Sequence, residues 1–249
     1  ARLFNRTTRS VSLSEVGAEF VETITPALLS IRTALEQAGN RSTEPSGTLR
    51  LNTSAGAAKQ VMPLLLEYLR RYPRMKLDIV TEGRLVDIVA QGFDAGIRLG
   101  DTVPQDMIAV DISPAQRFAV LGSPDYFASH PIPISPLDLR AHHCIRSRMP
   151  SGAIYHWEFE RHGEAIAVEV QGALTLDNPT LMLEAARAGL GLTYLTEWNA
   201  AADLANGTLV RVLEEWTPSF DCLRLYYPGR RHVPAGLRAL IELIREQGF

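Results

Sequence analysis

From residue 48 onward, strand-like runs alternate with amphipathic helical stretches, and this alternation limits the possible folds more than any other feature of the sequence. The runs TLRLNTSA, KLDIVTE and DAGIRLG have the length and the residue types of strands. Helical patterns separate them, at residues 57–72 and across LVDIVAQG. Because strands that alternate with helices form parallel sheets with helices on their faces, the pattern predicts an α/β fold.

A similar strand and helix return at the end of the chain, after a segment of different character. The run YHWEFERHGEAIAVEVQGALTL is typical of a hairpin, and CLRLYYP with residues 234–246 then gives a last strand and helix. We therefore expect two lobes, with the chain leaving the first near Leu121 and returning near Phe220. Two lobes joined by crossing strands leave a cleft, which is the usual place for a small ligand. Lobe I would comprise about residues 48–121 and 220–249, and lobe II about 122–219.

A long amphipathic helix is predicted over residues 15–38, with Ser14 as its N-cap. Its apolar stripe consists of Phe20, Ile24, Leu28, Ile31 and Leu35. A single helix cannot bury such a stripe, so the helix packs either on its own globular domain or against a second copy of the chain. The periodicity does not separate these alternatives. Residues 39–47, GNRSTEPSG, have the composition of a linker.

The composition is that of an ordinary globular chain, with 46% hydrophobic residues, 21% charged residues and a net charge of −3. These values argue against a disordered, fibrous or membrane protein. The N-terminus lacks the apolar core of a secretory signal, so we expect a cytoplasmic location. The charge also excludes a wholly basic surface, although Arg2, Arg6 and Arg9 give the N-terminal end a basic character.

The sequence offers little support for catalysis or for a bound metal. The two cysteines, Cys144 and Cys222, lack metal-ligand spacing and are expected to be reduced and buried. His142, His143 and His156 are the histidines that could join Cys144 in catalysis, but adjacent histidines on a strand point to opposite faces. HExxH, CxxC, GxSxG and GxxxxGK[ST] motifs are absent. We expect neither an enzyme, a cofactor nor a metal site.

Several segments, in their order and spacing, resemble one family. LFNRTTRSVSLSEVG is similar to the wing and the start of the linker helix of LysR-type transcriptional regulators. The segments LRLNTSAGAAKQVMPLLLEYLRRYP, VDIVAQGFDAGIRLGD, FAVLGSPDYFASH, AARAGLGLTYLTEW and LYYPGRRHVPAGLRALIELI resemble the effector-binding domain of these regulators, above all of the group that includes CrgA. The resemblance implies a two-lobed fold like that of the type 2 periplasmic binding proteins over residues 48–249.

The resemblance also assigns roles to the N-terminal segments. Residues 1–14 would be the wing, a remnant of a winged helix-turn-helix, because the family's recognition helix precedes the segment that matches LFNRTTR. Residues 15–38 would be the linker helix through which the family dimerises, and 39–47 a hinge. We therefore expect the printed chain not to read an operator by itself. The implied partners are operator DNA through the full-length protein, a small-molecule effector, and a homodimer or homotetramer. The wing could still contact phosphates, or it could be an ordinary exposed hairpin; its candidate contacts are Arg6, Thr7, Thr8 and Arg9.

The resemblance places the effector between the lobes, and lobe I offers suitable chemistry. Thr53 and Ser54 end the first strand, and their hydroxyls with the backbone N–H groups of Ala55 and Gly56 could hold a carboxylate. The alternative is that Ser54 only caps the helix. Arg98 ends the strand DAGIRLG and could clamp a carboxylate. It could instead form an ion pair with Asp94 or Asp101.

Lobe II supplies a second set of candidates. Arg146 and Arg148 have the same strand parity, so both can face one side, and two arginines opposite Ser54 suggest an acidic effector. The alternative is a solvated pair of charges. Asp177, Asn178 and Thr196 lie at a helix start and a strand end that face the ligand in related proteins, although capping alone also explains Asn178.

These features favour a ligand-responsive transcriptional regulator whose effector changes the arrangement of its oligomer on DNA. The alternative is a solute-binding protein that delivers a ligand to a transporter, because such proteins share the two-lobed fold. That class carries an export signal and lacks both the wing and the long N-terminal helix, which the sequence instead predicts.

Overall fold

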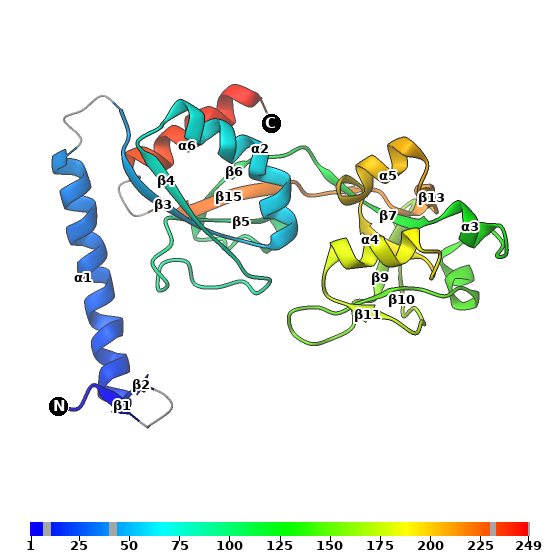
Figure 1. Cartoon of the computed structure of the whole chain (residues 1–249), viewed down its shortest axis with the longest axis horizontal. Helices are drawn as coiled ribbons and strands as arrows, with labels where there is room; N and C mark the ends of the chain where they lie inside the picture. Colours follow the sequence, from blue (N-terminus) through cyan, green and yellow to red (C-terminus); the bar gives the residue numbers. More distant parts are fainter. Residues whose placement is uncertain (7–10, 40–43, 230–232, 249) are drawn as a thin grey trace. The chain divides into compact units, whose positions relative to one another are not determined.

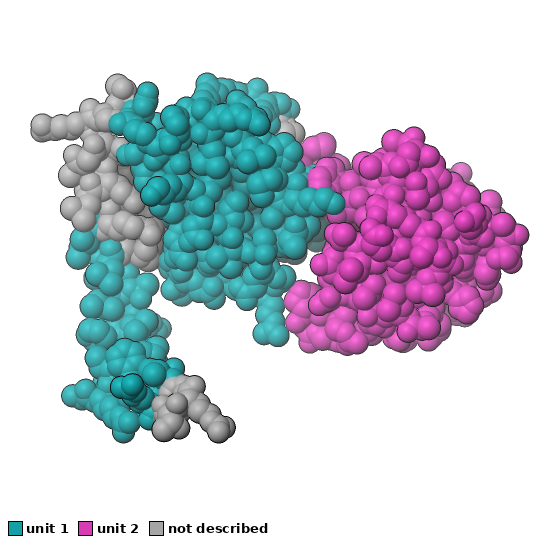
Figure 2. Space-filling view, viewed as in Figure 1, with its two compact units in different colours: residues 1–112, 224–249 teal, residues 113–223 magenta. Residues whose placement is uncertain are grey.

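The structure is a computed structural model that describes residues 1–6, 11–39, 44–229 and 233–248. It consists of two compact units (Figure 2). Unit 1 comprises Ala1–Ile112 and Arg224–Phe249, and unit 2 comprises Ser113–Leu223. In the described part of the chain no helix has the length and apolar character needed to cross a bilayer.

Unit 1 is built on a five-stranded sheet with the order β4-β3-β5-β15-β6 (Figure 1). Strand β3 runs parallel to both β4 and β5, and β15 is antiparallel to β6. The alternation of strands and helices thus produces the parallel sheet that it predicts. The strands are β3 (Gly47–Thr53), β4 (Met75–Thr81), β5 (Ala95–Leu99), β6 (Met107–Asp111) and β15 (Leu223–Pro228).

Helices α2 (Ala55–Arg71) and α6 (Ala235–Gln247) belong to this unit and are joined by a buried hydrogen bond from the Tyr68 hydroxyl to the Gly236 carbonyl, 2.9 Å long. Each helix buries one apolar stripe, and each fully buried leucine contributes ~2 kcal/mol. The buried apolar side chains of α2 are Ala57, Ala58, Val61, Leu64, Leu65 and Tyr68, and those of α6 are Leu237, Ala239, Leu240, Ile241, Leu243 and Ile244.

The segment LVDIVAQG forms turns, so the prediction of a helix there is wrong. The Asp87 carboxylate accepts hydrogen bonds from the backbone N–H groups of Val89 and Ala90 at 2.9 and 3.0 Å, and Gly92 has a positive φ of 72°. A side chain that bonds its own following backbone competes with helix formation. Ile88 in this segment and Phe93 directly after it are buried and pack with Tyr226.

At the N-terminus, β1 (Phe4–Arg6) and β2 (Val11–Leu13) pair as an antiparallel hairpin, and α1 (Glu15–Gly39) follows at once. The Ser14 hydroxyl accepts a hydrogen bond from the Gly17 N–H at 3.0 Å, which is the predicted cap. A Cβ at Gly17 would overlap the Leu3 carbonyl, so the hairpin approaches α1 closely only because this residue is glycine.

Unit 2 is centred on β7 (Gln116–Gly122), which pairs antiparallel with three other strands. Because these partners are all in unit 2, RFAVLG belongs to unit 2 rather than to lobe I. The crossings therefore lie after Ile112 and before Arg224, instead of near Leu121 and Phe220. The partners of β7 are β12 (Thr193–Thr196), β13 (Val210–Val212) and β14 (Ser219–Phe220).

A hairpin of β9 (Trp157–Arg161) and β10 (Glu164–Val168) and a short parallel pair of β8 (Arg146–Ser147) and β11 (Thr175–Leu176) complete the strands of unit 2. Trp157 is fully buried and stacks on Tyr194 with ring centres 5.3 Å apart. The helices of this unit are α3 (Pro124–Phe127), α4 (Pro179–Arg187) and α5 (Ala201–Asn206).

Candidate functional site

The carboxyl ends of the parallel strands in unit 1 form one polar edge. The register of β3 with its two neighbours places Thr53 beside Thr81 of β4 and Ile97 of β5. Helix α2 begins directly after β3, so its first turn lies at this edge. Open α/β sheets bind ligands at such carboxyl ends, where helix N-termini offer free N–H groups.

Ser54 caps α2 and remains able to serve a ligand. Its hydroxyl oxygen accepts a hydrogen bond from the Ala57 N–H at 3.2 Å, which leaves the hydroxyl proton as a donor. The first N–H groups of the helix have no intrahelical acceptor, and the first turn carries no acidic residue. A Cβ at Gly56 would meet nothing within 4 Å, so there is open space beside this turn. Capping and ligand binding are therefore compatible at Ser54.

Thr53, which precedes Ser54, is not exposed at the start of α2. It is fully buried, and its hydroxyl donates to the Ser54 carbonyl at 3.3 Å. In this conformation its side chain is directed into the unit rather than toward a solvent-borne ligand.

Arg98 is buried at the end of β5, with 7% of its surface exposed. Its guanidinium donates hydrogen bonds to five oxygens, none of which belongs to a carboxylate. The described structure contains no ion pair between Arg98 and Asp94 or Asp101, so that alternative is wrong; the Asp94 carboxylate instead accepts from the Arg50 N–H at 2.8 Å. Burial lowers the pKa of Arg98, while Tyr226 and the charge of Glu82 act to raise it.

Two polar residues beside Arg98 were not among the predicted site residues. Asn52 and Tyr226 are both fully buried, and Asn52 Oδ1 accepts from Arg98 Nη2 at 2.6 Å. A Cβ at Gly96 would overlap the Tyr226 ring, so the ring passes over that glycine. The signal in the sequence was an asparagine directly after the apolar Leu51 in the strand LRLNT.

Unit 2 has a corresponding edge. The N–H groups of Ile145, Arg146 and Arg148 donate to the carbonyls of Leu192, Leu174 and Leu176 at 2.7, 2.9 and 2.7 Å. These bonds align three neighbouring segments, so that their ends lie at one edge of the unit. The predicted residues in or directly after these segments are Arg146, Arg148, Asp177, Asn178 and Thr196.

The five residues differ in what they can offer a ligand. Arg146 is partly buried, and its Nε has no hydrogen-bond partner within the described structure. Arg148 is exposed and donates to the Gly152 carbonyl at 3.1 Å. Asn178 caps α4 through the N–H groups of Thr180 and Leu181, and Asp177 is exposed. The Thr196 hydroxyl accepts from the Asn199 side chain at 2.6 Å, which adds Asn199 to the residues that sequence reasoning missed.

The histidines and Cys144 form a structural cluster. The Tyr126 hydroxyl lies 3.0 Å from Nδ1 of buried His142 and accepts from the His143 N–H at 3.1 Å. Burial raises the pKa of the Cys144 thiol to about 12, so it is not a nucleophile near neutral pH. No group of histidine, cysteine and acidic side chains within the described ranges is arranged to hold a metal ion.

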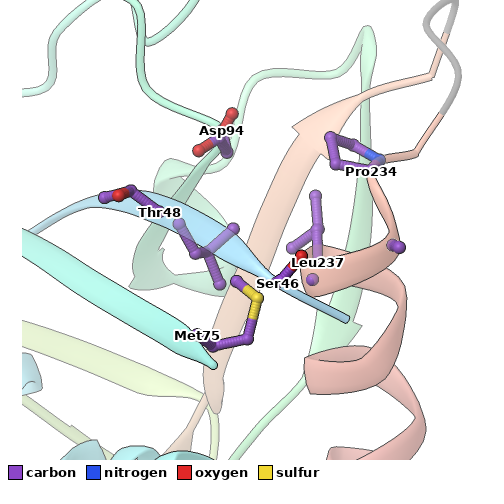
Figure 3. Close-up of a pocket in the computed structure, with 9 residues that line it drawn as sticks. Ser46, Thr48, Met75, Asp94, Pro234 and Leu237 are labelled. Atoms are coloured by element: carbon purple, nitrogen blue, oxygen red, sulfur yellow. The ribbon is translucent and has the colours of Figure 1, made fainter. Parts of the chain in front are cut away.

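A small pocket lies at the amino-terminal end of β3, lined by Ser46, Thr48, Met75 and Asp94 together with the start of α6 (Figure 3). Its volume is about 20 Å³, which is enough for about one water molecule. This pocket is therefore too small for an organic ligand.

The chain thus has a hairpin, a long helix and then two units with polar strand ends. This arrangement is typical of a module that binds a small molecule. Residues 42–248 match the LysR substrate binding domain. The chain is 40% identical to the HTH-type transcriptional regulator YcaN of Escherichia coli K12 and 35% identical to PgrR of the same organism. These matches cover 98% and 99% of this chain and 80% and 83% of the relatives. The chain belongs to the family of LysR-type transcriptional regulators and carries their effector-binding domain.

Solved structures of this family share the fold. Full-length AphB of Vibrio cholerae matches with a TM-score of 0.75 and 23% identity, over 98% of this chain and 83% of that chain. CrgA of Neisseria meningitidis matches with a TM-score of 0.71 and 24% identity, over 100% of this chain and 85% of that chain. The relatives are named as transcriptional regulators, so a transport-linked solute-binding protein is not favoured.

Proposed function

We propose that this regulator senses a small anionic molecule, which the start of α2 binds through the Ser54 hydroxyl and the N–H groups of Ala55 and Gly56. The observation that carries the proposal is the state of this helix start. The N–H groups of Ala55 and Gly56 have no acceptor in the described structure, the first turn carries no acidic residue, and there is open space at Gly56. A helix N-terminus with these properties favours negative charge.

The remaining predicted residues extend the proposal to both units. Arg146 and Arg148 are the cations at the edge of unit 2, and Thr196, Asp177 and Asn178 lie beside them. In this proposal the arginines supply charge-assisted hydrogen bonds to an acidic group of the effector. An acid is therefore the ligand class that the donors of each unit fit.

Binding becomes regulation only if the effector prefers one arrangement of the oligomer over another. We propose that α1 joins two copies, because Phe20, Leu28 and Ile31 remain 49%, 56% and 56% exposed on it. The hairpin would contact DNA phosphates through Arg6, which is exposed at the end of β1, and through Thr7, Thr8 and Arg9, which lie outside the described residues. A regulator of this kind acts in the cytoplasm, as a homodimer or homotetramer and without catalysis.

A thermal-shift screen of the whole chain against small carboxylates and aromatic acids tests the proposal. A ligand present at 100 times its Kd stabilises the folded state by about 2.7 kcal/mol. We expect a hit whose stabilisation is lost in Ser54→Ala, measured against the variant's own baseline because loss of the cap itself costs ~1 kcal/mol.

Ser123→Ala is the matched control for that experiment. Ser123 caps α3 through the Tyr126 N–H at 3.2 Å, as Ser54 caps α2, but it belongs to no candidate site. The control should keep the full ligand-induced shift. Equal loss of the shift in both variants, or no acid that stabilises the chain, would contradict the proposed function.

A further inference from the structure

Arg98 is a buried cation held only by neutral oxygens in the part of the chain that the structure describes. Nη1 donates to the carbonyls of Asn52 and Ile97 at 3.3 and 2.8 Å. Nη2 donates to Asn52 Oδ1 and to the carbonyls of Glu82 and Arg84 at 2.6, 3.2 and 3.0 Å. Both terminal nitrogens of the guanidinium are bonded in this way, and Nε is buried without a hydrogen-bond partner in the described structure. Because only 7% of its surface is exposed, Arg98 is unsuited to clamp a ligand directly.

The oxygens that Arg98 binds belong to segments next to the start of α2. Asn52 lies two residues before Ser54 on β3, while Glu82 and Arg84 lie in the loop that follows β4. The Glu82 N–H in turn donates to the Thr53 carbonyl at 2.7 Å. Arg98 therefore ties β3, β5 and this loop together on the side where the first turn of α2 begins.

Carbonyl oxygens hold a guanidinium without cancelling its charge. The Glu82 carboxylate lies near enough to favour the charged form, but it forms no ion pair with Arg98 in the described structure. Two extended residues span about 7 Å, so the guanidinium lies roughly 10 Å from the first turn of α2. At that distance, with an effective dielectric constant of ~20, a full charge changes the binding constant of an anion about tenfold.

We propose that Arg98 is a positioning and specificity-determining residue: its buried charge, fixed beside the start of α2 by Asn52 and the 82–84 loop, makes this site prefer anions without touching them. The inference rests on the proposed function, because it concerns the site formed by Ser54, Ala55 and Gly56. It differs from direct recognition, in which Arg98 would release its carbonyl partners and bind the ligand itself.

The test is a titration of the whole chain with sodium sulfate at constant ionic strength and pH 6, followed by the amide NMR signals of residues 54–56. Sulfate carries two charges, so Arg98→Met should weaken its binding about a hundredfold, whereas Arg98→Lys keeps a charge there and should stay within about threefold of the original chain. Arg71→Met is the matched control. It removes the same net charge from the last turn of α2, about 25 Å away at 1.5 Å per residue, and should have no effect.

The outcomes distinguish a failure of the proposed role of Arg98 from a failure of the anion site at residues 54–56. If sulfate shifts the signals of residues 54–56 equally in Arg98→Met and Arg71→Met, the role of Arg98 is refuted while the site itself stands. Equal weakening in Arg98→Met and Arg98→Lys would assign the effect to the geometry of the loop, and would also overturn a role for the charge. If sulfate does not move these signals in the unaltered chain, both the site and the inference fail.

A succinate titration gives the readout that a purely structural role would not move. Succinate and its neutral diamide have nearly the same shape, but only succinate is charged. The charge of Arg98 predicts that Arg98→Met weakens succinate binding about tenfold and leaves the diamide unchanged. Equal weakening of both compounds would contradict the inference.

Discussion

At the scale of single residues, polar groups decide how the edge of unit 1 is built. Asn52 and Arg98 are buried on neighbouring strands, and Arg98 donates a hydrogen bond to Asn52 Oδ1, while Tyr226 lies over Gly96. The sequence predicted that Arg98 would lie at the strand end, but not its partners. Four of the five partner oxygens belong to residues 14–46 positions away, and no local pattern indicates which oxygens the fold will bring there.

Gly96→Ala should destabilise unit 1 by ~1–3 kcal/mol, because the new methyl group would overlap the Tyr226 ring in a well-packed core. Gly56→Ala is the control, since a Cβ there meets open space and a helical alanine gains up to ~1 kcal/mol over glycine. Urea unfolding followed by circular dichroism measures both. Equal midpoints for Gly96→Ala and the unaltered chain would show that the ring is not packed against this glycine.

The His142 imidazole makes unit 2 sensitive to acid. Burial lowers its pKa below the usual 6.5, the neighbouring His130 and His143 lower it further, and Asp138 opposes them. Because the unfolded chain then binds a proton more readily, the contribution of His142 to stability is complete above pH 6.5 and is lost as the pH falls through the folded-state pKa.

We therefore expect the free energy of unfolding to fall between pH 7 and pH 5, and His142→Asn to reduce that fall while still offering an acceptor to Tyr126. His156→Gln is the control, because His156 is exposed. Urea unfolding across the pH series measures the effect. An unchanged slope in His142→Asn would exclude this residue as its source.

At the scale of elements, the sequence predicted the strands and helices better than their partners. Alternation and capping indicated β3, α2, β4 and β5, and Ser14 and Asn178 are caps as expected. The segment LVDIVAQG has helical periodicity, yet the Asp87 side chain holds its backbone in turns. The assignment of RFAVLG to lobe I was wrong because strand pairing in unit 2 is non-local, and residues 193–220 supply the partners of β7.

The contact between α4 and α5 depends on one partly buried ion pair. Arg187 binds both carboxylate oxygens of Asp203, at 2.7 and 2.8 Å, and Asp203 is 4% exposed. Asp203→Ala should cost ~1–3 kcal/mol, because it leaves Arg187 without its buried partner. Glu67→Ala breaks the exposed pair with Arg70 and should cost less than ~1 kcal/mol. Similar losses in the two variants, measured by urea unfolding, would contradict a special role for the buried pair.

At the scale of the whole molecule, we propose that helix α1 pairs copies of the chain and that the two units bind an effector. Phe20, Leu28 and Ile31 form an exposed apolar stripe on α1. Exposure of such a stripe to water is unfavourable and is typical of an interaction surface. Whether α1 packs on its own domain or on a second copy was left open by the periodicity, and the proposed dimer answers that question in a testable way.

Phe20→Glu together with Leu28→Glu should shift the chain from dimer or tetramer toward monomer in sedimentation at micromolar concentration, because two carboxylates would be buried in the helix contact. Glu22→Lys is the control, since Glu22 is exposed and lies on the opposite side of the helix from Phe20. An unaltered chain that sediments as a monomer would refute dimerisation through α1.

The most direct test of the central claim is a crystal structure of the chain with the acid that stabilises it most in the thermal-shift screen. The account predicts that a carboxylate oxygen lies about 2.9 Å from the N–H nitrogens of Ala55 or Gly56, while Arg98 keeps its bonds to Asn52. A ligand bound elsewhere, with the first turn of α2 contacted only by water, would contradict it.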